Sequence, residues 1–514
     1  MSIIACVEKL IRYTLYSTVS RLIYKPKLSI QTENVRTMST HYDAVIIGSG
    51  QGGTPLSMAF AKAQHKTALI ESSHVGGCCV NEGCTPTKTM IASGRVAYLA
   101  RRGRQYGIYT SDQVDAAQNS VKVKMEVVRQ RKRDIVDRFR SGSERRIREA
   151  GVHLIFGTAC FNDERTIHVR TLEGPEMSLT ADRVFICSGE RPAIPEIDGL
   201  DVAAFPPGTI LNSTSVQELG VVPSHLVVIG GGYIGLEFGQ LFRRLGAAVT
   251  VIQRGAQLLP REDADVAEAM LSVLKEDGVR VLLNAAPTAI RPAGNQDPAT
   301  AVAVSGRDGQ SELLASHVLF AAGRVPNTEM LNLGAASIET TARGHIITDA
   351  QLRTSNHRVW ALGDVKGGPA FTHVSYDDFR LLRANLIEKG NLTVADRLIP
   401  YVVYTDPQLG HVGLHEHEAR EKYPDCKIQV ANMPMSYVAR ALETDETRGL
   451  IKAVINADSQ RILGFTCLGV EGGEIMSLVE MAMIGGVKWT ALRDAIWAHP
   501  SLAESLNNLW GFLK

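Results

Sequence analysis

The chain has 514 residues, of which 45% are hydrophobic and 21% are charged, and these proportions exclude a disordered or fibrous protein. A single hydrophobic core rarely supports a chain of this length, so we expect several domains. Lys and Arg total 55 against 54 Asp and Glu. With charges so balanced, the protein as a whole has no positive electrostatic field that would attract nucleic acid or acidic membranes. No apolar run approaches the ~20 residues of a membrane span, so we expect neither nucleic acid nor a membrane as partner.

The first part of the chain, residues 1–41, is basic and rich in Ser and Thr, with only two acids, Glu8 and Glu33. This composition is typical of a mitochondrial transit peptide. The alternatives are a disordered extension, or an upstream stretch before a true start at Met38. The expected location is therefore the mitochondrial matrix or the cytoplasm.

A glycine-rich turn follows the first predicted strand, which covers residues 42–48. Gly48, Gly50 and Gly53 form G-x-G-x-x-G, the signature of a dinucleotide-binding strand–helix–strand unit. In such a unit the first glycine permits the tight turn, the second lets a pyrophosphate approach, and the third lets the helix pack closely. The next predicted strand ends in Glu71, whose carboxylate can accept hydrogen bonds from a ribose diol, which favours FAD or NAD.

Two cysteines, Cys79 and Cys84, enclose four residues shortly after this unit. They lie at the predicted start of a helix, where the helix N-terminus and the nearby Lys88 both favour a reactive thiolate. The joint pattern of these cysteines with Asn81, Pro86 and Lys88 resembles the active-site motif of the class I pyridine nucleotide–disulfide oxidoreductases. That family includes dihydrolipoamide dehydrogenase, glutathione reductase and mercuric reductase.

The remaining cysteines are scattered, apart from Cys78 beside Cys79, and no double pair of the zinc type appears. In a long chain without a disulfide framework, one close pair is typical of redox catalysis in a reducing compartment. We therefore expect no metal site. For Cys78 we favour a packing role in place of a small residue over a role in handling metal.

Residues 129–148 hold nine Lys or Arg side chains, a density that also occurs in nucleic-acid or nuclear-import segments. The basic residues alternate with Ile, Val and Phe at helical spacing. We therefore expect the solvated face of an amphipathic helix.

A second copy of the nucleotide-binding signature begins with a predicted strand over residues 225–230. Gly230, Gly232 and Gly235 repeat the spacing of the first copy, and a helix and a strand follow. A lone signature of this kind is weak, but two copies in full context predict two dinucleotide sites.

The second copy differs from the first at the end of its second strand, where Gln253 replaces the carboxylate. Arg254 follows, and Arg261 lies nearby. Loss of the carboxylate removes repulsion against a 2′-phosphate, and a guanidinium can pair with that phosphate bidentately. The second site is therefore predicted to take NADPH, with NADH as the alternative because Gly235 stands where NADP-binding units often carry Ala.

The resemblance to the family extends over nearly everything from Tyr42 to the C-terminus. It implies that Glu237 is the acidic partner of Lys88 and that Gly323 lies at the end of the nicotinamide domain, next to NADP. The residues that it places at FAD are Ser188, Gly189, Asp364 and, in the segment 371–380, Thr372.

Near the C-terminus, His499-Pro500 with Glu504 resembles the family's His-Pro signature. The resemblance implies that His499 is the acid–base group of thiol–disulfide exchange and that Glu504 orients it. An imidazole suits proton transfer near neutral pH. In the family this His reaches the cysteines of the other subunit, so a homodimer is expected.

The predicted fold class is α/β, with two Rossmann-like FAD/NAD(P)-binding domains and a C-terminal α+β dimerisation domain. The expected parts are a leader or extension at 1–41, the first part of the FAD domain at 42–190, the NAD(P) domain at 191–325, the second part of the FAD domain at 326–390 and the interface domain at 391–514.

The predicted function is an FAD-dependent NAD(P)H:disulfide oxidoreductase, in which hydride passes from NADPH via FAD to the Cys79–Cys84 disulfide and on to a small disulfide or related acceptor. The resemblance implies that Cys84 faces the flavin and that Cys79 is the interchange thiol. Lys88, paired with Glu237, is expected to stabilise the reduced ring.

Several alternatives for the substrate stay open. Residues 127–142 and 371–380 look most like mercuric reductase-like proteins, but no vicinal cysteines follow Cys467 and no amino-terminal Cys-x-x-Cys module is present. Dihydrolipoamide dehydrogenase fits the His499–Glu504 pair but usually uses NAD. Two further enzyme alternatives are a glutathione reductase and a quinone-type diaphorase. The non-enzymatic alternative is a flavin-binding regulatory module.

Overall fold

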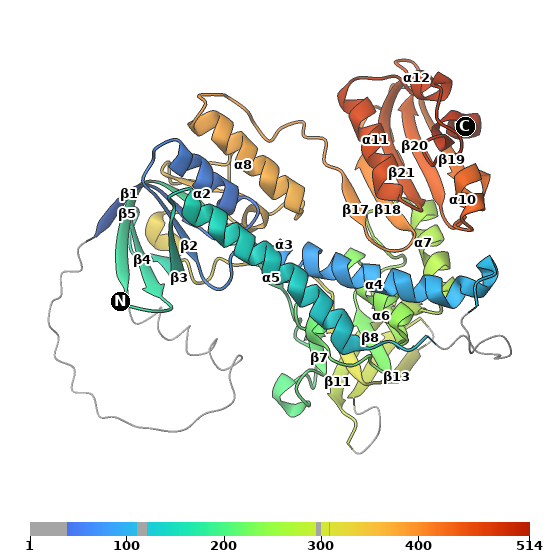
Figure 1. The fold of residues 1–514 in the computed structure, drawn as a ribbon, viewed down its shortest axis with the longest axis horizontal. Coiled ribbons are helices and arrows are strands. Elements are labelled where there is room, and N and C mark those ends of the chain that lie inside the picture. The colour runs from blue at the N-terminus through green and yellow to red at the C-terminus, as the bar shows by residue number, and fades with distance from the viewer. Residues whose placement is uncertain (1–38, 110–120, 295–299, 308) are drawn as a thin grey trace. The chain divides into compact units, whose positions relative to one another are not determined.

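The computed structural model describes residues 39–109, 121–294, 300–307 and 309–514 (Figure 1). The expected leader at 1–41 therefore lies almost wholly outside the described residues. The described residues form two compact units, one within Met1–Asn81, Asp137–Arg191 and Val325–Ala395 and the other within Glu82–Val136, Pro192–Arg324 and Asp396–Lys514. In the described part of the chain, no helix is long and apolar enough to cross a membrane.

The first unit is built on a six-stranded sheet in which β3, β2, β1, β5 and β16 run parallel, while β4 runs antiparallel to its neighbours β3 and β5. Its strands are β1 Thr40–Ile47, β2 Thr67–Glu71, β3 His153–Phe161, β4 Thr166–Thr171, β5 Met177–Ile186 and β16 Val359–Ala361. Its helices include α2 Gly53–Lys62, α3 Gly77–Asn81 and α8 Thr372–Leu386.

The strands of this sheet carry apolar side chains on both faces, so the sheet lies between two hydrophobic cores. Successive residues of β1 point to opposite faces, so Val45 and Ile47 enter one core while Ala44 and Ile46 enter another. The second of these cores also holds Phe60 of α2 and side chains of α8. Strands buried on both faces are typical of parallel sheets covered by helices.

The second unit contains a five-stranded parallel sheet in the order β10-β9-β8-β14-β7 and a three-stranded antiparallel sheet, β11-β12-β13. The parallel strands are β7 Ile210–Asn212, β8 His225–Ile229, β9 Ala248–Gln253, β10 Arg280–Leu283 and β14 His317–Phe320. The antiparallel strands are β11 Ala286–Pro292, β12 Thr300–Gly306 and β13 Gly309–Ala315, and the helices are α4 Cys84–Arg102, α6 Tyr233–Leu245 and α7 Ala264–Glu276.

The C-terminal part of the second unit is a five-stranded antiparallel sheet in the order β17-β18-β21-β20-β19 with helices on it. The strands are β17 Tyr401–Val403, β18 Gln408–Gly413, β19 Ile428–Pro434, β20 Leu450–Asn456 and β21 Arg461–Gly469. The helices are α9 Glu416–Lys422, α10 Ala439–Glu443, α11 Gly472–Ile484, α12 Trp489–Asp494 and α13 Ser505–Asn508. The predicted α/β class with a C-terminal α+β domain is confirmed.

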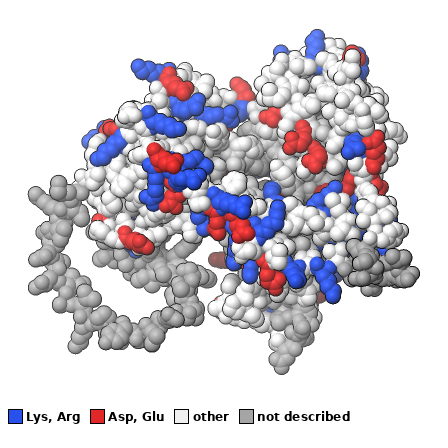
Figure 2. Space-filling view, in the orientation of Figure 1, with Lys and Arg blue, Asp and Glu red and all other residues white. Residues whose placement is uncertain are grey.

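The basic stretch forms α5 Met125–Glu149, as its spacing predicted. Its buried positions follow helical spacing and are Met125, Lys132, Val136, Ser143 and Ile147. The Lys132 ammonium is buried but pairs with Glu218, which belongs to the same unit. Basic and acidic side chains lie interspersed on the face drawn in Figure 2, as on an ordinary solvated surface.

Candidate functional site

The first glycine turn lies between β1 and α2, in the first unit. Gly48 has φ of 103°, and a Cβ at this position would lie 2.4 Å from the Cys187 carbonyl oxygen. A Cβ at Gly53 would lie 2.0 Å from the Gly48 carbonyl oxygen. At Gly50 the nearest atom to an added Cβ is 4.0 Å away, the Cα of Gly77. Two glycines are thus required by the turn itself, and the middle one leaves the backbone open to a ligand.

Glu71, at the end of β2, binds this turn through its carboxylate. Its Oε2 accepts hydrogen bonds from the Ser49 backbone N–H at 3.1 Å and from the Ser49 hydroxyl at 2.5 Å, and its Oε1 accepts from the Ser73 N–H at 2.8 Å. α2 has no acid in its first turn and no side-chain cap, so its N-terminal N–H groups keep their partial positive charge for a phosphate.

Ser188 and Gly189 follow β5 and are held by Asn327. The Asn327 side-chain amide donates to the Ser188 carbonyl at 2.8 Å, and its backbone N–H donates to the Gly189 carbonyl at 2.9 Å. The Ser188 hydroxyl is buried and makes no hydrogen bond to any described residue. A buried polar group normally has a partner, so this hydroxyl fits a bound group such as FAD.

Asp364 lies in a short 3₁₀ turn, Asp364–Lys366, that packs against α8. The Gly363 N–H donates to Asp378 at 2.9 Å, and Ser375 donates to Asp364 at 3.4 Å. Thr372 is the first residue of α8. Apart from Lys88, which lies in the second unit, the predicted FAD residues therefore lie in the first unit, and the open turn and the orphaned hydroxyl fit that cofactor.

Cys79 lies in the short helix α3, which is anchored on the first glycine turn. Gly77 begins α3 with φ of 61°, and a Cβ there would lie 2.5 Å from the Gly50 Cα. The Asn81 side chain donates to the carbonyls of His74, Val75 and Gly77 and accepts from Arg140. Sequence reasoning included Asn81 in the motif but missed Gly77, although its place in a Gly-Gly pair before the cysteines was a signal.

Cys84 is the first residue of α4, so the predicted helix start is found here, and α4 belongs to the second unit. It is exposed, and α4 has no side-chain cap and no acid in its first turn. The Gln217 side chain donates to the Glu82 carbonyl at 2.7 Å and so holds the chain just before the helix. A thiol at such a helix end lies where the backbone N–H groups favour a thiolate.

Lys88 lies on α4, one turn beyond Cys84, and its Nζ is 2.8 Å from Glu237 Oε2 on α6. The other carboxylate oxygen of Glu237 accepts from the Tyr404 backbone N–H at 2.8 Å, and only 3% of the Glu237 side chain is exposed. Burial lowers the pKa of Lys88, but the charges of Glu237 and of the Cys84 thiolate outweigh it and raise the pKa above its usual value. Lys88 is therefore a fixed cation next to Cys84.

The second glycine turn, between β8 and α6, repeats the first almost atom for atom. Gly230 has φ of 118°, and a Cβ there would lie 2.4 Å from the Ala321 carbonyl oxygen. A Cβ at Gly235 would lie 2.1 Å from the Gly230 carbonyl oxygen, whereas one at Gly232 would meet no described atom within 4 Å. α6 also lacks an acid in its first turn. The turn fits a second pyrophosphate.

Gln253 occupies in this turn the place that the carboxylate has in the first. Its Oε1 accepts from the Gly231 N–H at 3.2 Å, and its Nε2 donates to the Gln257 carbonyl at 3.0 Å. Arg254 and Arg261 are exposed. Gly323 has φ of 139°, and the space beside it is open within 4 Å.

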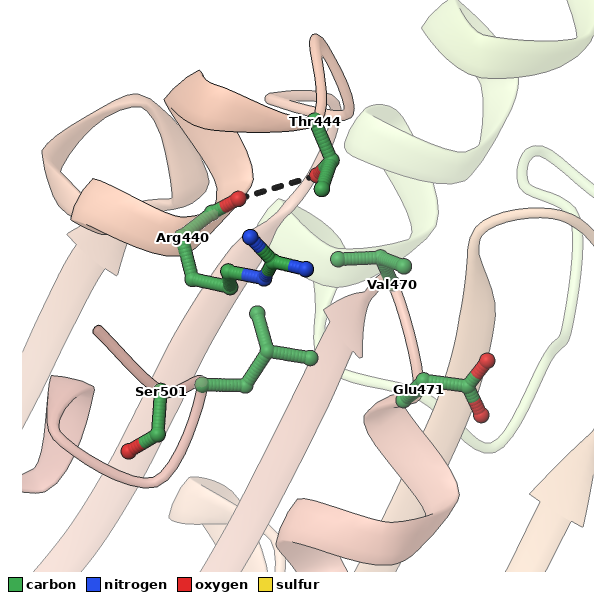
Figure 3. Close-up of a pocket in the computed structure, with 6 residues that line it drawn as sticks. Arg440, Thr444, Val470, Glu471 and Ser501 are labelled. Carbon is green, nitrogen blue, oxygen red and sulfur yellow. Dashed lines mark hydrogen bonds between the residues drawn. The ribbon is translucent and has the colours of Figure 1, made fainter. Parts of the chain in front are cut away.

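His499 and Glu504 lie together in the loop between α12 and α13. The His499 Nδ1 is 2.9 Å from the Glu504 carboxylate, and 66% of the His499 side chain is exposed. The Ser501 hydroxyl accepts from the Glu504 N–H at 3.2 Å. Ser501 and Leu502 of this loop also line a pocket of about 370 Å³ (Figure 3). The remaining lining residues are Arg440, Thr444, Val470 and Glu471.

Comparisons with known proteins agree with this geometry. The family model "Pyridine nucleotide-disulphide oxidoreductase" matches residues 42–378, and its dimerisation domain matches residues 399–509. The chain is 35% identical over 477 residues to the probable pyridine nucleotide-disulfide oxidoreductase RclA of Escherichia coli, covering 92% of this chain and 99% of that protein. It is 34% identical over 466 residues to mercuric reductase of Staphylococcus aureus, covering 90% and 81%.

A solved structure, the HOCl-induced flavoprotein disulfide reductase RclA from Escherichia coli, superposes with a TM-score of 0.80 at 34% identity, covering 92% of this chain and 100% of that one. These relatives are bacterial and lend no support to a mitochondrial location. The predicted enzyme class and its cofactors are confirmed. The chain belongs to the class I pyridine nucleotide–disulfide oxidoreductases, flavoenzymes that use FAD and NAD(P)H to act on a sulfur group.

Proposed function

We propose that this enzyme reduces a small disulfide or a related electron acceptor with NADPH, through a redox couple formed by Cys79 and Cys84. The observation that carries the proposal is the arrangement on α4, where Cys84 begins an uncapped helix and the Lys88–Glu237 pair lies one turn further on. Four residues separate the two cysteines in the chain, which is short enough for a disulfide.

FAD, when bound, supplies the two-electron relay between the nicotinamide and the cysteines. The residues proposed to hold it are Ser188, Gly189, Asp364, Thr372 and the first glycine turn. Cys84 is the thiol proposed to face the flavin, because the helix N-terminus and Lys88 stabilise its thiolate. Glu237 keeps the Lys88 ammonium in place for that role.

Cys79 is proposed as the thiol that meets the substrate. Its thiolate attacks one sulfur of the substrate disulfide, a Cys79–substrate disulfide forms, and the substrate S–S bond breaks. The leaving thiolate takes a proton from His499, which Glu504 orients through Nδ1. Cys84 then attacks Cys79, which restores the protein disulfide and releases the second substrate thiolate.

The preference for NADPH rests on three side chains at the second glycine turn. Gln253 is neutral where the first turn has a carboxylate, and Arg254 and Arg261 are exposed nearby in the sequence. The two arginines can pair with a 2′-phosphate, and the neutral Gln253 side chain does not repel it as a carboxylate would.

A homodimer is proposed because the chain carries the family's dimerisation domain and because His499 is largely exposed within one subunit. In the family this His completes the site of the other subunit. Ser501 and Leu502, which follow the proposed proton donor by two and three residues, line a pocket that Arg440 and Glu471 also line.

The experiment is steady-state oxidation of NADPH and of NADH against lipoamide, glutathione disulfide, mercuric ion and a quinone. We expect turnover of a disulfide with NADPH that is lost in Cys79→Ser and in Cys84→Ser while FAD stays bound. Turnover of the quinone alone, at equal rates in wild type and both variants, would instead assign a diaphorase. Mercury-dependent turnover as the only activity would assign a metal-ion reductase.

A further inference from the structure

Tyr404 contacts both members of the Lys88–Glu237 pair. Its backbone N–H donates to Glu237 Oε1 at 2.8 Å, while the Lys88 Nζ lies over its ring, 4.8 Å from the ring centroid. The third contact, between the Lys88 Nζ and Glu237 Oε2, is 2.8 Å long. The three residues come from α4, α6 and the chain just after β17, and all belong to the second unit. They therefore form a closed set of contacts around one ammonium.

The backbone that carries this ring is tied to α6 independently of the ring. One turn beyond Glu237 on the same helix, the Gln240 side-chain oxygen accepts from the Asp406 N–H at 2.8 Å. The Gln240 Nε2 donates to the Asp406 carbonyl at 2.9 Å. Because these bonds do not involve the Tyr404 side chain, a change of that side chain should leave the local backbone in place.

The ring of Tyr404 meets the cation as a neutral aromatic face. Burial raises the pKa of the Tyr404 phenol. Lys88 lowers this pKa, but the nearby negative groups raise it, and these are Glu237, Cys84 and Glu474. The phenol therefore keeps its proton near neutral pH. What Lys88 contacts is the negative π face of the ring, which attracts a cation within about 6 Å of the centroid.

The Lys88 ammonium is carried on a flexible four-carbon stem, so one contact does not hold it at one point. The Lys88 side chain is 28% exposed, whereas that of Glu237 is 3% exposed. Without the ring, the ammonium is free to turn toward water. Lys88 follows Cys84 by four residues on α4, and residues at this spacing are neighbours on one helix face. A displaced ammonium would therefore stabilise the Cys84 thiolate less.

We propose that Tyr404 is a positioning residue, whose aromatic ring holds the Lys88 ammonium close to the Cys84 sulfur and so keeps that thiol reactive. The inference rests on the proposed role of Cys84 as the flavin-facing thiol. Because the attraction comes from the ring and not from the hydroxyl, Phe should replace Tyr404 and an aliphatic residue should not.

The test is the rate at which iodoacetamide alkylates Cys84 in the FAD-loaded Cys79→Ser protein, where Cys84 cannot pair with residue 79. Peptide mass spectrometry identifies the alkylated cysteine over a series of pH values. In Tyr404→Leu the rate near neutral pH should fall at least about threefold, and the midpoint of the pH profile should move to higher pH. Tyr404→Phe should match this parent protein. So should the control, Tyr423→Leu, which removes another ring of the same unit that lies 5.7 Å from the Lys422 Nζ.

Pentafluorophenylalanine at position 404 gives a second test, since it keeps the shape of a phenyl ring but reverses the charge of its face. The alkylation rate should fall at least as far as in Tyr404→Leu. Bound FAD and far-ultraviolet circular dichroism show whether each variant is folded. Should Tyr404→Leu not fold, the fluorinated ring decides.

The proposal is overturned if the parent reacts fast and either Tyr404→Leu or the fluorinated variant reacts equally fast. It is also overturned if Tyr404→Phe slows the reaction as much as Tyr404→Leu, because the hydroxyl would then be the active group. A parent whose Cys84 reacts no faster near neutral pH than a cysteine in an unfolded peptide would contradict the proposed function and this proposal together.

Discussion

Lys88 and Glu237 are 149 positions apart in the chain, yet the Lys88 Nζ lies 2.8 Å from a Glu237 oxygen. The second oxygen of the same carboxylate accepts from the backbone of Tyr404, so three segments of the second unit meet at one acid. This contact fixes the cation that lies one turn beyond Cys84.

Glu237→Gln tests that contact. The change leaves the largely buried Lys88 ammonium without its counter-charge, so the free energy of unfolding should fall by about 3–5 kcal/mol and turnover should fall as well. Urea unfolding followed by circular dichroism measures the first effect and NADPH oxidation the second. Glu268→Gln, on the exposed face of α7, is the control and should change neither. Unaltered stability and turnover in Glu237→Gln would contradict a role for the pair.

Gly53→Ala tests the first nucleotide turn. The added methyl group would lie 2.0 Å from the Gly48 carbonyl oxygen, so the turn must distort and FAD should be lost during purification. The flavin-to-protein absorbance ratio measures this loss. Gly334→Ala, in the same unit but with no atom within 4 Å of the added group, should retain FAD like the wild type. Full flavin content in Gly53→Ala would show that the turn does not hold the cofactor.

The arginines after β9 should decide between the nicotinamide cofactors. In Arg254→Ala/Arg261→Ala, the KM for NADPH should rise at least about tenfold, because two phosphate-pairing charges are removed. The KM for NADH is the internal control and should hardly move, since NADH has no 2′-phosphate. Parallel changes for both cofactors would mean that the arginines act on folding instead of on phosphate recognition.

Asp406 makes the stability of the second unit depend on pH. Burial raises the pKa of Asp406, but Arg244 and Arg95 outweigh burial and hold it below the usual value of 3.8. A carboxylate with a lowered folded pKa contributes stability above its unfolded pKa and loses it as the pH falls through the folded value. Asp406→Asn should therefore cost about 3–5 kcal/mol near neutral pH, and the difference from wild type should shrink below 3.8.

Urea unfolding at a series of pH values checks this expectation. Asp425→Asn, which changes an exposed carboxylate of the same unit, is the control and should follow the wild type throughout. If the difference in unfolding free energy between Asp406→Asn and the wild type does not vary with pH, the effect comes from altered packing and not from loss of the carboxylate charge.

The parts of the site that lie close together in sequence were predictable. The spacing of Gly48, Gly50 and Gly53 determines a local turn, and the structure places β1 and α2 around it. The start of α4 at Cys84 and the amphipathic helix α5 follow from local signals too. In each case the interaction that fixes the structure lies within about one supersecondary unit.

Contacts between distant segments were not predictable from the residues themselves. The contacts of Glu71 with Ser49 and Ser73, the orphaned Ser188 hydroxyl and the Asn81 bonds all depend on how loops meet. The cluster of Glu262, His411 and His415 brings a glutamate next to two histidines about 150 positions further along the chain, a contact that no local pattern predicts. The five-part division of the chain stays a prediction.

The central claim is that reducing equivalents from NADPH reach Cys79 and Cys84. The most direct measurement is the number of thiols per chain that react with a colorimetric disulfide reagent, before and after one equivalent of NADPH under anaerobic conditions. We predict two new thiols in the wild type and none in Cys79→Ser or Cys84→Ser. No new thiols in the wild type, or two new thiols in both variants, would contradict the claim.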